Sequence, residues 1–352
     1  MKPGRNIALL LLAILLSLTV AACAMGAQST ASPAAPVQAT ALAAPAAPGT
    51  PAAVEIPHGE LAMEHLAFMN GQMNRRTSFT QREVRAAHWI VQTLLEMGHP
   101  RENIVLQRFA STIEPNWQAW LDDIDFFGDL EQLGYSQNVI LTLPGQSDRV
   151  IVIGAHYDTF RDYIGASDNA SGVALLLESA QRMRQINNYY TLVYVFFGAE
   201  EVNLAGARHF FGSLSAAERQ NIRFMFNADV LLEGPYLIYI TGVYENGERA
   251  ENDLTRRWDA LAGQLNTRHG IELTNQTDVT GIWFSDHEVF YEQGIPVIFL
   301  TGMARSPEGN LVGSVVHSAR DDLNYINRAW PGMAQRNMRA FSLLMEAVLL
   351  NS

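Results

Sequence analysis

The sequence is poor in cysteine and in basic residues. Cys23 is the only cysteine among 352 residues, so the chain can form no intramolecular disulfide. Lysine and arginine together number 24 against 36 acidic residues, which gives a formal net charge of −12. Nucleic acid and anionic lipid surfaces are therefore not expected as partners.

Two motifs of common hydrolases are also missing. No Gly-x-Ser-x-Gly occurs, which argues against a serine hydrolase with a nucleophile elbow. The zinc motif His-Glu-x-x-His does not occur either, because the nearest match, from His287 to Tyr291, reads His-Glu-Val-Phe-Tyr. Any hydrolytic chemistry must therefore use a different set of residues.

The N-terminal stretch has the features of an export signal. Lys2 and Arg5 precede an apolar run of 14 residues, 7–20, which is shorter than the roughly 20 residues that a membrane-spanning helix needs. The following letters VAAC end at Cys23 and resemble a bacterial lipobox, in which the cysteine carries the lipid. We expect residues 1–22 to be a lipoprotein signal peptide and Cys23 to anchor the protein to the cell envelope. An ordinary signal peptide and a secreted protein are the alternative.

The next segment differs in composition from the rest of the chain. Residues 23–57 consist largely of alanine, proline, threonine and serine, which predicts an extended, semi-rigid tether without a core of its own. Residues 58–352 show no repeat and no second break in composition. We expect them to form one domain, since 48% of the whole chain is apolar.

Apolar runs alternate with helical patterns along this domain. Thr80 and Glu83 have capping-box spacing ahead of a helix that ends near Gly98. Buried strands interleaved with helices predict a three-layer α/β/α sandwich around a mixed, mostly parallel β-sheet. Residues 117–135 show no clear period and cannot be assigned. The other expected elements are strands at 103–109, 137–143, 149–155, 190–197, 223–229, 236–242 and 296–302, and helices at 171–186, 204–215, 250–268 and 330–350.

Several of these strand-like runs are followed by side chains that can bind metal ions or transfer protons. Sites in open α/β sheets form beyond the carboxyl ends of the strands, where such residues would meet. The candidates are His156 and Asp158 after RVIVIGA, Asp168 in the next loop, Glu200 and Glu201 after YTLVYVFF, Asp229 after RFMFNA, and His317 in VVHSARDDL.

Taken singly, each candidate has an ordinary structural explanation. A His-x-Asp pair is usually a structural hydrogen bond, and Asp168 precedes a helix that it could cap. Together, two imidazoles and several carboxylates match the ligands of a divalent ion such as Zn²⁺, with Mn²⁺ or Co²⁺ as substitutes. His156 and Asp158 lie two apart on an extended segment, so Asp158 can hold the second imidazole nitrogen.

The order of the motifs HYDT, SDNASG, GAEE, NAD, SDH and VH resembles the zinc-dependent exopeptidases of the aminopeptidase Y and bacterial leucyl aminopeptidase family. The resemblance spans roughly residues 60–350. It implies two Zn²⁺ ions bridged by Asp168. It also implies that His156 and Asp229 complete the site of one ion, and that Glu201 and His317 complete the site of the other.

The same resemblance implies roles for the neighbouring residues. Glu200 matches the general base, Asp158 matches the partner of the first histidine, and the Asp168-Asn169 peptide bond is expected to be cis. Ser285 belongs to a motif near the site, although its spacing to Glu288 also suits a helix cap.

The reaction implied is hydrolysis of the N-terminal bond of peptides that carry a free N-terminus. Two cations share a water, lower its pKa and polarise the carbonyl, while Glu200 accepts the proton and passes it to the leaving amine. Val230 and Val316 flank expected ligands and could line the pocket for an apolar first side chain. Carboxypeptidase or amidohydrolase activity and a glutaminyl cyclase are the alternatives. A non-catalytic ectodomain is disfavoured because every ligand position is kept.

Overall fold

The computed structural model describes residues 56–245, 248–276 and 284–352. The expected signal peptide, the lipid anchor and nearly all of the tether lie outside the described residues, so these expectations stay predictions. Within the ranges that are described, no helix is both long and apolar enough to cross a membrane.

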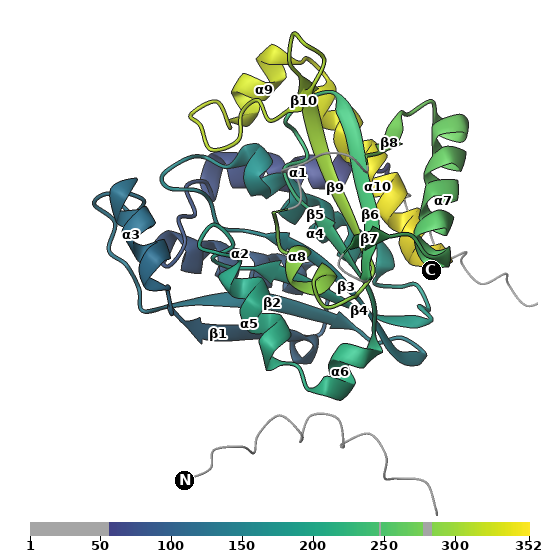
Figure 1. Ribbon diagram of the computed structural model, residues 1–352, viewed down its shortest axis with the longest axis horizontal. Coiled ribbons are helices and arrows are strands. Elements are labelled where there is room, and N and C mark those ends of the chain that lie inside the picture. Colours follow the sequence, from purple (N-terminus) through teal and green to yellow (C-terminus); the bar gives the residue numbers. More distant parts are fainter. Residues whose placement is uncertain (1–55, 246–247, 277–283) are drawn as a thin grey trace, which may run out of the picture. The chain divides into compact units, whose positions relative to one another are not determined.

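A mixed β-sheet forms the middle of the described domain (Figure 1). Its strands are β1 (Ile104–Ala110), β2 (Tyr135–Leu143), β3 (Ser147–His156), β4 (Tyr190–Phe197), β5 (Ile222–Ala228), β6 (Tyr236–Glu245), β7 (Glu248–Ala250), β8 (Leu273–Asn275), β9 (Val297–Arg305) and β10 (Leu311–Val312). The order is β1-β2-β4-β3-β5-β9-β6-β7, with β10 beside β9 and β8 beside β6. The central strands β4, β3, β5 and β9 are parallel, whereas β1, β2, β6 and β7 join the main path by antiparallel pairs.

Helices cover both faces of this sheet. They are α1 (Glu60–Gln72), α2 (Gln81–Glu96), α3 (Pro115–Asp123), α4 (Ser171–Met183), α5 (Ala205–Ser213), α6 (Ala216–Asn221), α7 (Asp253–His269), α8 (Glu288–Tyr291), α9 (Leu323–Ala329) and α10 (Met333–Asn351). The helices expected from the sequence correspond to α2, α4, α5, α7 and α10. Short 3-10 and π turns lie at Arg101–Asn103 and Ala166–Ala170.

Alternating side chains of the central strands separate two apolar cores. Ile151 and Ile153 of β3 pack on the face that α1, α2, α4, α7 and α10 cover. Val152 of the same strand packs on the opposite face, together with side chains of α5 and α8. Successive residues of a strand point to opposite faces, so an unbroken apolar run is buried on both. The predicted three-layer α/β/α sandwich is confirmed.

The unassigned stretch contains a helix and an aromatic cluster. Glu114 and Pro115 open α3, where the proline fits the first helical turn. Phe126 and Phe127, beyond the end of α3, are buried against Phe79 and Phe109 in a small separate core. This core attaches α3 to the domain at the edge where the central strands end.

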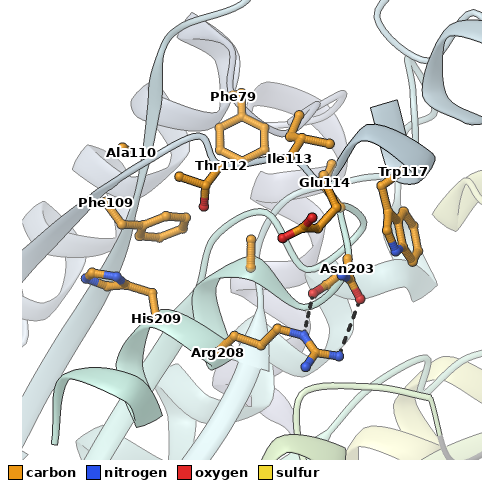
Figure 2. A pocket seen from close by; sticks show the side chains of 12 residues that line it. Phe79, Phe109, Ala110, Thr112, Ile113, Glu114, Trp117, Asn203, Arg208 and His209 are labelled. Atoms are coloured by element: carbon orange, nitrogen blue, oxygen red, sulfur yellow. Dashed lines mark hydrogen bonds between the residues drawn. The ribbon is translucent and has the colours of Figure 1, made fainter. Parts of the chain in front are cut away.

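Two of the cavities that open beside α3 also reach the ends of strands. One, of about 310 Å³, is lined by Trp117 and Trp120 of α3 and by side chains at the ends of β3 and β5. The other, of about 320 Å³, lies between β1, the start of α3 and the first turn of α5 (Figure 2). The first cavity contains the residues that the sequence singles out.

Candidate metal centre

Three neighbouring parallel strands bring most of the candidate residues to one edge of the sheet. His156 is the last residue of β3, Asp229 directly follows β5, and Glu200 with Glu201 lies just beyond β4. Because the carboxyl ends of parallel strands meet at the same edge, residues far apart in the chain become neighbours. Loops between elements bring in Asp168, from Ala166–Ala170, and His317, from the segment between β10 and α9.

Asp168 lies between the two histidines. Its Oδ1 is 3.1 Å from His156 Nε2, and its Oδ2 is 3.2 Å from His317 Nε2. Asp229 Oδ1 is 3.1 Å from the same nitrogen of His156, and Glu201 Oε2 is 3.1 Å from that of His317. These contacts link the five residues through Asp168, and Glu200 also lies within ligand distance of His156 and Asp229.

The spacing of these atoms suits metal ions. Nitrogen and oxygen ligands about 2.0–2.2 Å from a tetrahedral zinc lie about 3.3 Å from one another. The nitrogen–oxygen separations of 3.1 and 3.2 Å are close to that value. The buried Oε1 of Glu201 has no hydrogen-bond partner among the described residues. The residues present therefore fit a metal centre.

The buried carboxylates around the site have little positive charge nearby to balance them. Arg76 is fully buried nearby, but its hydrogen bonds all go to main-chain carbonyl oxygens. Buried carboxylates without compensating charge are costly, so divalent ions are the natural counter-charge. The carboxylates concerned are those of Asp158, Asp168, Glu200, Glu201, Asp229 and Asp286.

The crowding of acids shifts the pKa values of the site. Burial opposes the charged form of His317, but Glu201 and Asp168 together raise its pKa to about 11. Burial, with repulsion from Asp168, raises the pKa of Glu201 to about 7. Burial, with repulsion from Glu201 and other acids, raises the pKa of Glu200 well above its ordinary value. The cluster of carboxylates therefore favours positive charge at the site.

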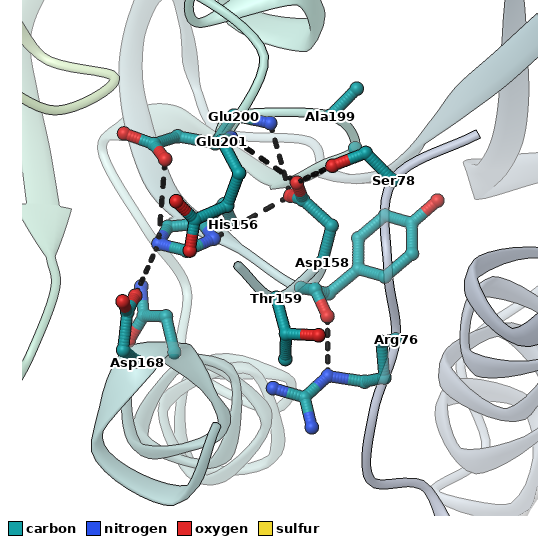
Figure 3. Close-up of polar contacts among 12 residues, drawn as sticks. Arg76, Ser78, His156, Asp158, Thr159, Asp168, Ala199, Glu200 and Glu201 are labelled. Carbon is teal, nitrogen blue, oxygen red and sulfur yellow. Dashed lines mark hydrogen bonds and ion pairs between the residues drawn. The ribbon is translucent and has the colours of Figure 1, made fainter. Parts of the chain in front are cut away.

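Asp158 positions both the histidine and the glutamate pair (Figure 3). Its Oδ1 lies 3.5 Å from His156 Nδ1, at the long limit of a hydrogen bond. The same carboxylate accepts hydrogen bonds from the main-chain N–H groups of Glu200, at 3.0 Å, and Glu201, at 3.2 Å. Ser78 Oγ donates a further bond of 2.6 Å. The spacing of His156 and Asp158 pointed to the first contact, but not to the others.

Ser285 serves the site and does not cap a helix. Its hydroxyl donates a 2.7 Å hydrogen bond to Asp229 Oδ2. The helix α8 begins at Glu288 and has His287 at its N-cap, so the cap suggested by the spacing of Ser285 and Glu288 is wrong. The short turn before α8 leaves Ser285 facing β5, where Asp229 needs a donor.

Two buried acids that the sequence did not single out fix the loops of the site. Asp321 accepts hydrogen bonds from the N–H groups of Ser167, at 2.5 Å, and Asp168, at 3.1 Å. Glu233 accepts from the N–H of Val315 at 2.7 Å, two residues before His317. The only signal for Asp321 in the sequence was its place in the same motif as His317.

Two further expectations concern the bond after Asp168 and the wall of the cavity. The Asp168-Asn169 peptide bond is cis. Val230 and Val316 both line the cavity of the site, so the guess that they face a bound side chain has a structural basis. Aromatic side chains complete its wall, and they are Trp117, Trp120, Phe160 and Phe284.

Known proteins share the sequence pattern of this domain. The model of peptidase family M28 matches residues 138–342. The alkaline phosphatase isozyme conversion protein of Escherichia coli K12 is 26% identical over 306 residues, which cover 77% of this chain and 84% of that protein. Aminopeptidase YwaD of Bacillus subtilis is 27% identical over 180 residues, 51% of this chain and 37% of that protein. The chain thus spans little more than a third of YwaD.

Solved structures share the fold. BSAP, a zinc aminopeptidase from Bacillus subtilis, superposes with a TM-score of 0.64 at 16% identity, over 84% of this chain and 95% of that one. The glutaminyl cyclase of an Acidobacteriales bacterium superposes with a TM-score of 0.61 at 20% identity, over 86% and 98%.

The match of the family model and the shared fold define a hydrolase of the metallopeptidase class. The chain belongs to peptidase family M28.

Proposed function

We propose that the protein is a di-zinc aminopeptidase that hydrolyses the N-terminal bond of peptides. The observation that carries this proposal is the position of Asp168, whose two carboxylate oxygens lie within 3.2 Å of different histidines. A carboxylate shared between two ligand groups suits a pair of ions. The zinc aminopeptidase BSAP, which shares the fold, supports the choice of metal and activity.

Each ion would have its own ligands besides the shared Asp168. His156 and Asp229 would hold one, and Glu201 and His317 would hold the other. Bound zinc would polarise the scissile carbonyl group and lower the pKa of a water molecule, and Mn²⁺ or Co²⁺ could replace it.

Glu200 is the proposed general base. Its Oε2 is 3.9 Å from His156 Nε2, against 3.1 Å for Asp229 Oδ1, so its carboxylate lies beside this pair of proposed ligands, where a water molecule bound to the metal would be. Burial and the neighbouring acids raise its pKa well above that of an ordinary glutamate, which suits a base that later returns the proton to the leaving amine. Asp158 fixes the main chain of Glu200 and thereby the direction of its side chain.

The cavity wall supports an apolar first residue in the substrate. Val230 and Val316 line the cavity beside the ligands, and Phe284 lies at its mouth with 55% of its surface exposed. Apolar walls favour the burial of apolar side chains by roughly 25 cal/mol per Å². Substrates that begin with leucine or a residue of similar size are therefore expected to be preferred over those that begin with a charged residue.

A glutaminyl cyclase is the second candidate, because one such enzyme superposes with a TM-score of 0.61. Carboxypeptidase and amidohydrolase reactions would use the same hydrolytic centre. A screen of aminoacyl anilides, N-blocked peptides and peptides with N-terminal glutamine separates these activities. The proposal predicts hydrolysis of the anilides, release of uncyclised glutamine from any glutamine peptide that is cleaved, and no cleavage of the blocked peptides. Cyclised glutamine as the product, or cleavage of blocked peptides alone, would contradict it.

Outside the described residues, we propose a lipoprotein signal at 1–22 and an Ala/Pro-rich tether at 23–57 that carries the catalytic domain, residues 58–352. Cys23 would then be acylated and anchor the protein to the cell envelope. Replacement of Cys23 by serine should shift the protein from the detergent phase to the aqueous phase in a phase-partition assay. An unchanged distribution would contradict the anchor.

A further inference from the structure

The second cavity shares a wall with the metal site. The side chain of Trp117 lines both cavities. Val202 and Asn203, which directly follow the predicted ligand Glu201, also line the second cavity (Figure 2). Trp117 therefore lies on the boundary between the metal site and this space.

The second cavity combines aromatic and charged side chains. Figure 2 shows the rings of Phe79 and Phe109 on one part of its wall and the guanidinium group of Arg208 on another. Glu114 contributes a carboxylate to the same cavity. Such a lining suits a ligand that carries both an apolar group and a charge.

Arg208 is an exposed cation of this cavity whose described hydrogen-bond partners are neutral, while Glu288, beyond ion-pair distance, interacts with it through charge alone. Its Nε donates to the main-chain oxygen of Asn203 at 2.9 Å, and Nη2 lies 3.4 Å from Oδ1 of the same residue. No described carboxylate oxygen lies within the 4.0 Å that defines an ion pair with its guanidinium group. The planar guanidinium binds carboxylates through two parallel hydrogen bonds, so Arg208 offers a site for one.

We propose that this cavity binds the part of a peptide substrate beyond the cut bond, and that Arg208 binds a carboxylate of that part. The inference rests on the aminopeptidase function proposed above. With the N-terminal residue at the metal site, the rest of the peptide must pass over the rim. Two or three extended residues span about 7–10 Å, enough to pass the single side chain of Trp117. An apolar side chain of the peptide then packs against Ile113 and Trp117, which line the cavity and are partly exposed.

The first test compares Leu-Gly-Phe that has a free C-terminal carboxylate with the same peptide as its amide. The wild type should show a kcat/KM about tenfold higher for the acid, because a charge-assisted hydrogen bond is lost in the amide. Arg208→Gln should bring the ratio close to one. Glu114→Gln should raise it, because the substitution removes a repelling charge from the same cavity. Arg256→Gln, an exposed arginine of α7, is the matched control and should keep the wild-type ratio.

The second test distinguishes a C-terminal carboxylate from an acidic side chain. The amides of Leu-Gly-Glu and Leu-Gly-Gln differ only in the charge of the third side chain. If the wild type prefers the amide of Leu-Gly-Glu and Arg208→Gln abolishes this preference, the carboxylate that Arg208 binds is that of the glutamate side chain. Equal rates for both pairs of peptides in the wild type, or a preference that survives in Arg208→Gln, would overturn the proposal.

Calorimetry separates failure of this inference from failure of the proposed activity. Binding of the acid and of the amide is measured with zinc-loaded Glu200→Gln and with the same protein carrying Arg208→Gln. Suppose that the wild type hydrolyses no peptide, but that Glu200→Gln binds the acid about tenfold more tightly than the amide and that Arg208→Gln removes this difference. The proposed aminopeptidase reaction is then wrong, while recognition of the carboxylate by Arg208 is supported. If the wild type hydrolyses peptides, but both forms bind equally, the role of the cavity fails alone.

Discussion

Glu200 and Glu201 are adjacent in the chain, but their carboxylates have different surroundings. Glu201 Oε2 lies 3.1 Å from His317 Nε2, whereas the nearest histidine nitrogen to Glu200 Oε2 is 3.9 Å away. The carboxylate of Asp158 accepts hydrogen bonds from the main-chain N–H groups of both residues, so one side chain holds the turn that separates the two glutamate side chains. Two like charges can be neighbours here because one would meet a metal ion and the other a water molecule.

This difference predicts different effects of matched substitutions. Glu200→Gln should keep both metal ions and lower kcat at least about 100-fold, because the amide cannot accept a proton from water. Glu201→Gln should lower metal affinity as well, because a carboxylate ligand is lost. Equilibrium dialysis against zinc, with kcat measured at saturating metal, checks both variants. An equal loss of metal from the two variants would contradict the assignment within the pair.

Asp321 is predicted to support metal binding without contacting the metal. Asp321→Asn removes one of the two acceptors for the N–H groups of Ser167 and Asp168, so the loop of the shared ligand should loosen. Loss of such an outer contact typically lowers metal affinity about 10–100-fold. Titration with a chelator of known affinity measures the change. The neighbour Asp322, which caps α9, provides the control: Asp322→Asn should keep the wild-type metal affinity.

The candidate ligands could be picked out from the sequence, but the residues that hydrogen-bond to them could not, and metal binding by these ligands stays a prediction. His156, Asp229 and the glutamate pair follow long apolar runs, and such runs mark strand ends clearly. The contact of Asp321 with Asp168 joins positions 153 residues apart. It depends on how the loop before α9 folds back over the sheet, and no local pattern contains that information. The roles expected for Glu200, as the general base, and for Glu201, as a metal ligand, came from the family resemblance. Residue type alone could not separate them, because two adjacent glutamates have the same chemistry.

Among the helices, α1 depends on a partner in another helix. Glu178 of α4 is buried and accepts hydrogen bonds from the N–H groups of Gly59, at 2.8 Å, and Ala62, at 2.9 Å, at the N-terminus of α1. Ser342 of α10 donates to the same carboxylate. A carboxylate at a helix N-terminus satisfies N–H groups that have no partner inside the helix.

Glu178→Ala should therefore lower the free energy of unfolding by about 3 kcal/mol. The substitution leaves several buried donors without an acceptor, and each costs about 1–3 kcal/mol, partly relieved by water. Urea unfolding measures the change. Glu96→Ala, at the exposed end of α2, is the control and should change stability by less than about 0.5 kcal/mol. A loss as small as that of the control would contradict the role of Glu178.

His99, directly beyond α2, predicts a pH dependence of stability. Burial, with a contribution from Arg184, lowers its pKa from 6.5 to about 4. Between these values the unfolded chain binds a proton that the folded chain does not, so stability falls as the pH falls. The wild type should lose about 2 kcal/mol more than His99→Gln between pH 7 and pH 4.5. Urea unfolding of both proteins at the two pH values tests this, and equal losses would contradict it.

Two elements that the sequence did not predict, α1 and α3, are stabilised by contacts with residues of other elements. The start of α1 is held by Glu178, and α3 is held by the small core around Phe126 and Phe127, so neither needed a strong local pattern. The strands β3, β4 and β5 were predicted nearly to the residue, because both of their faces are buried. A strand that is buried on both faces has apolar residues at consecutive positions, and this pattern is easy to recognise in a sequence.

The chain as a unit is acidic, and its site concentrates that charge. The formal net charge is −12, while the site adds several buried carboxylates to a single buried arginine, Arg76. The metal ions would be bound by His156 of β3 and by residues from four loops, one of them directly after β5, so they would also join these elements. The number of zinc ions bound per chain is therefore the quantity that matters most. Four positive charges balance the buried carboxylates far better than two.

The most direct test is therefore the zinc content of the purified domain, residues 58–352, measured by elemental analysis after equilibration with zinc and removal of the excess. The account predicts two ions per chain, falling below two when Asp168 is replaced by alanine, since both groups of ligands share that residue. A content of one ion per chain in the wild type, with full activity, would contradict it.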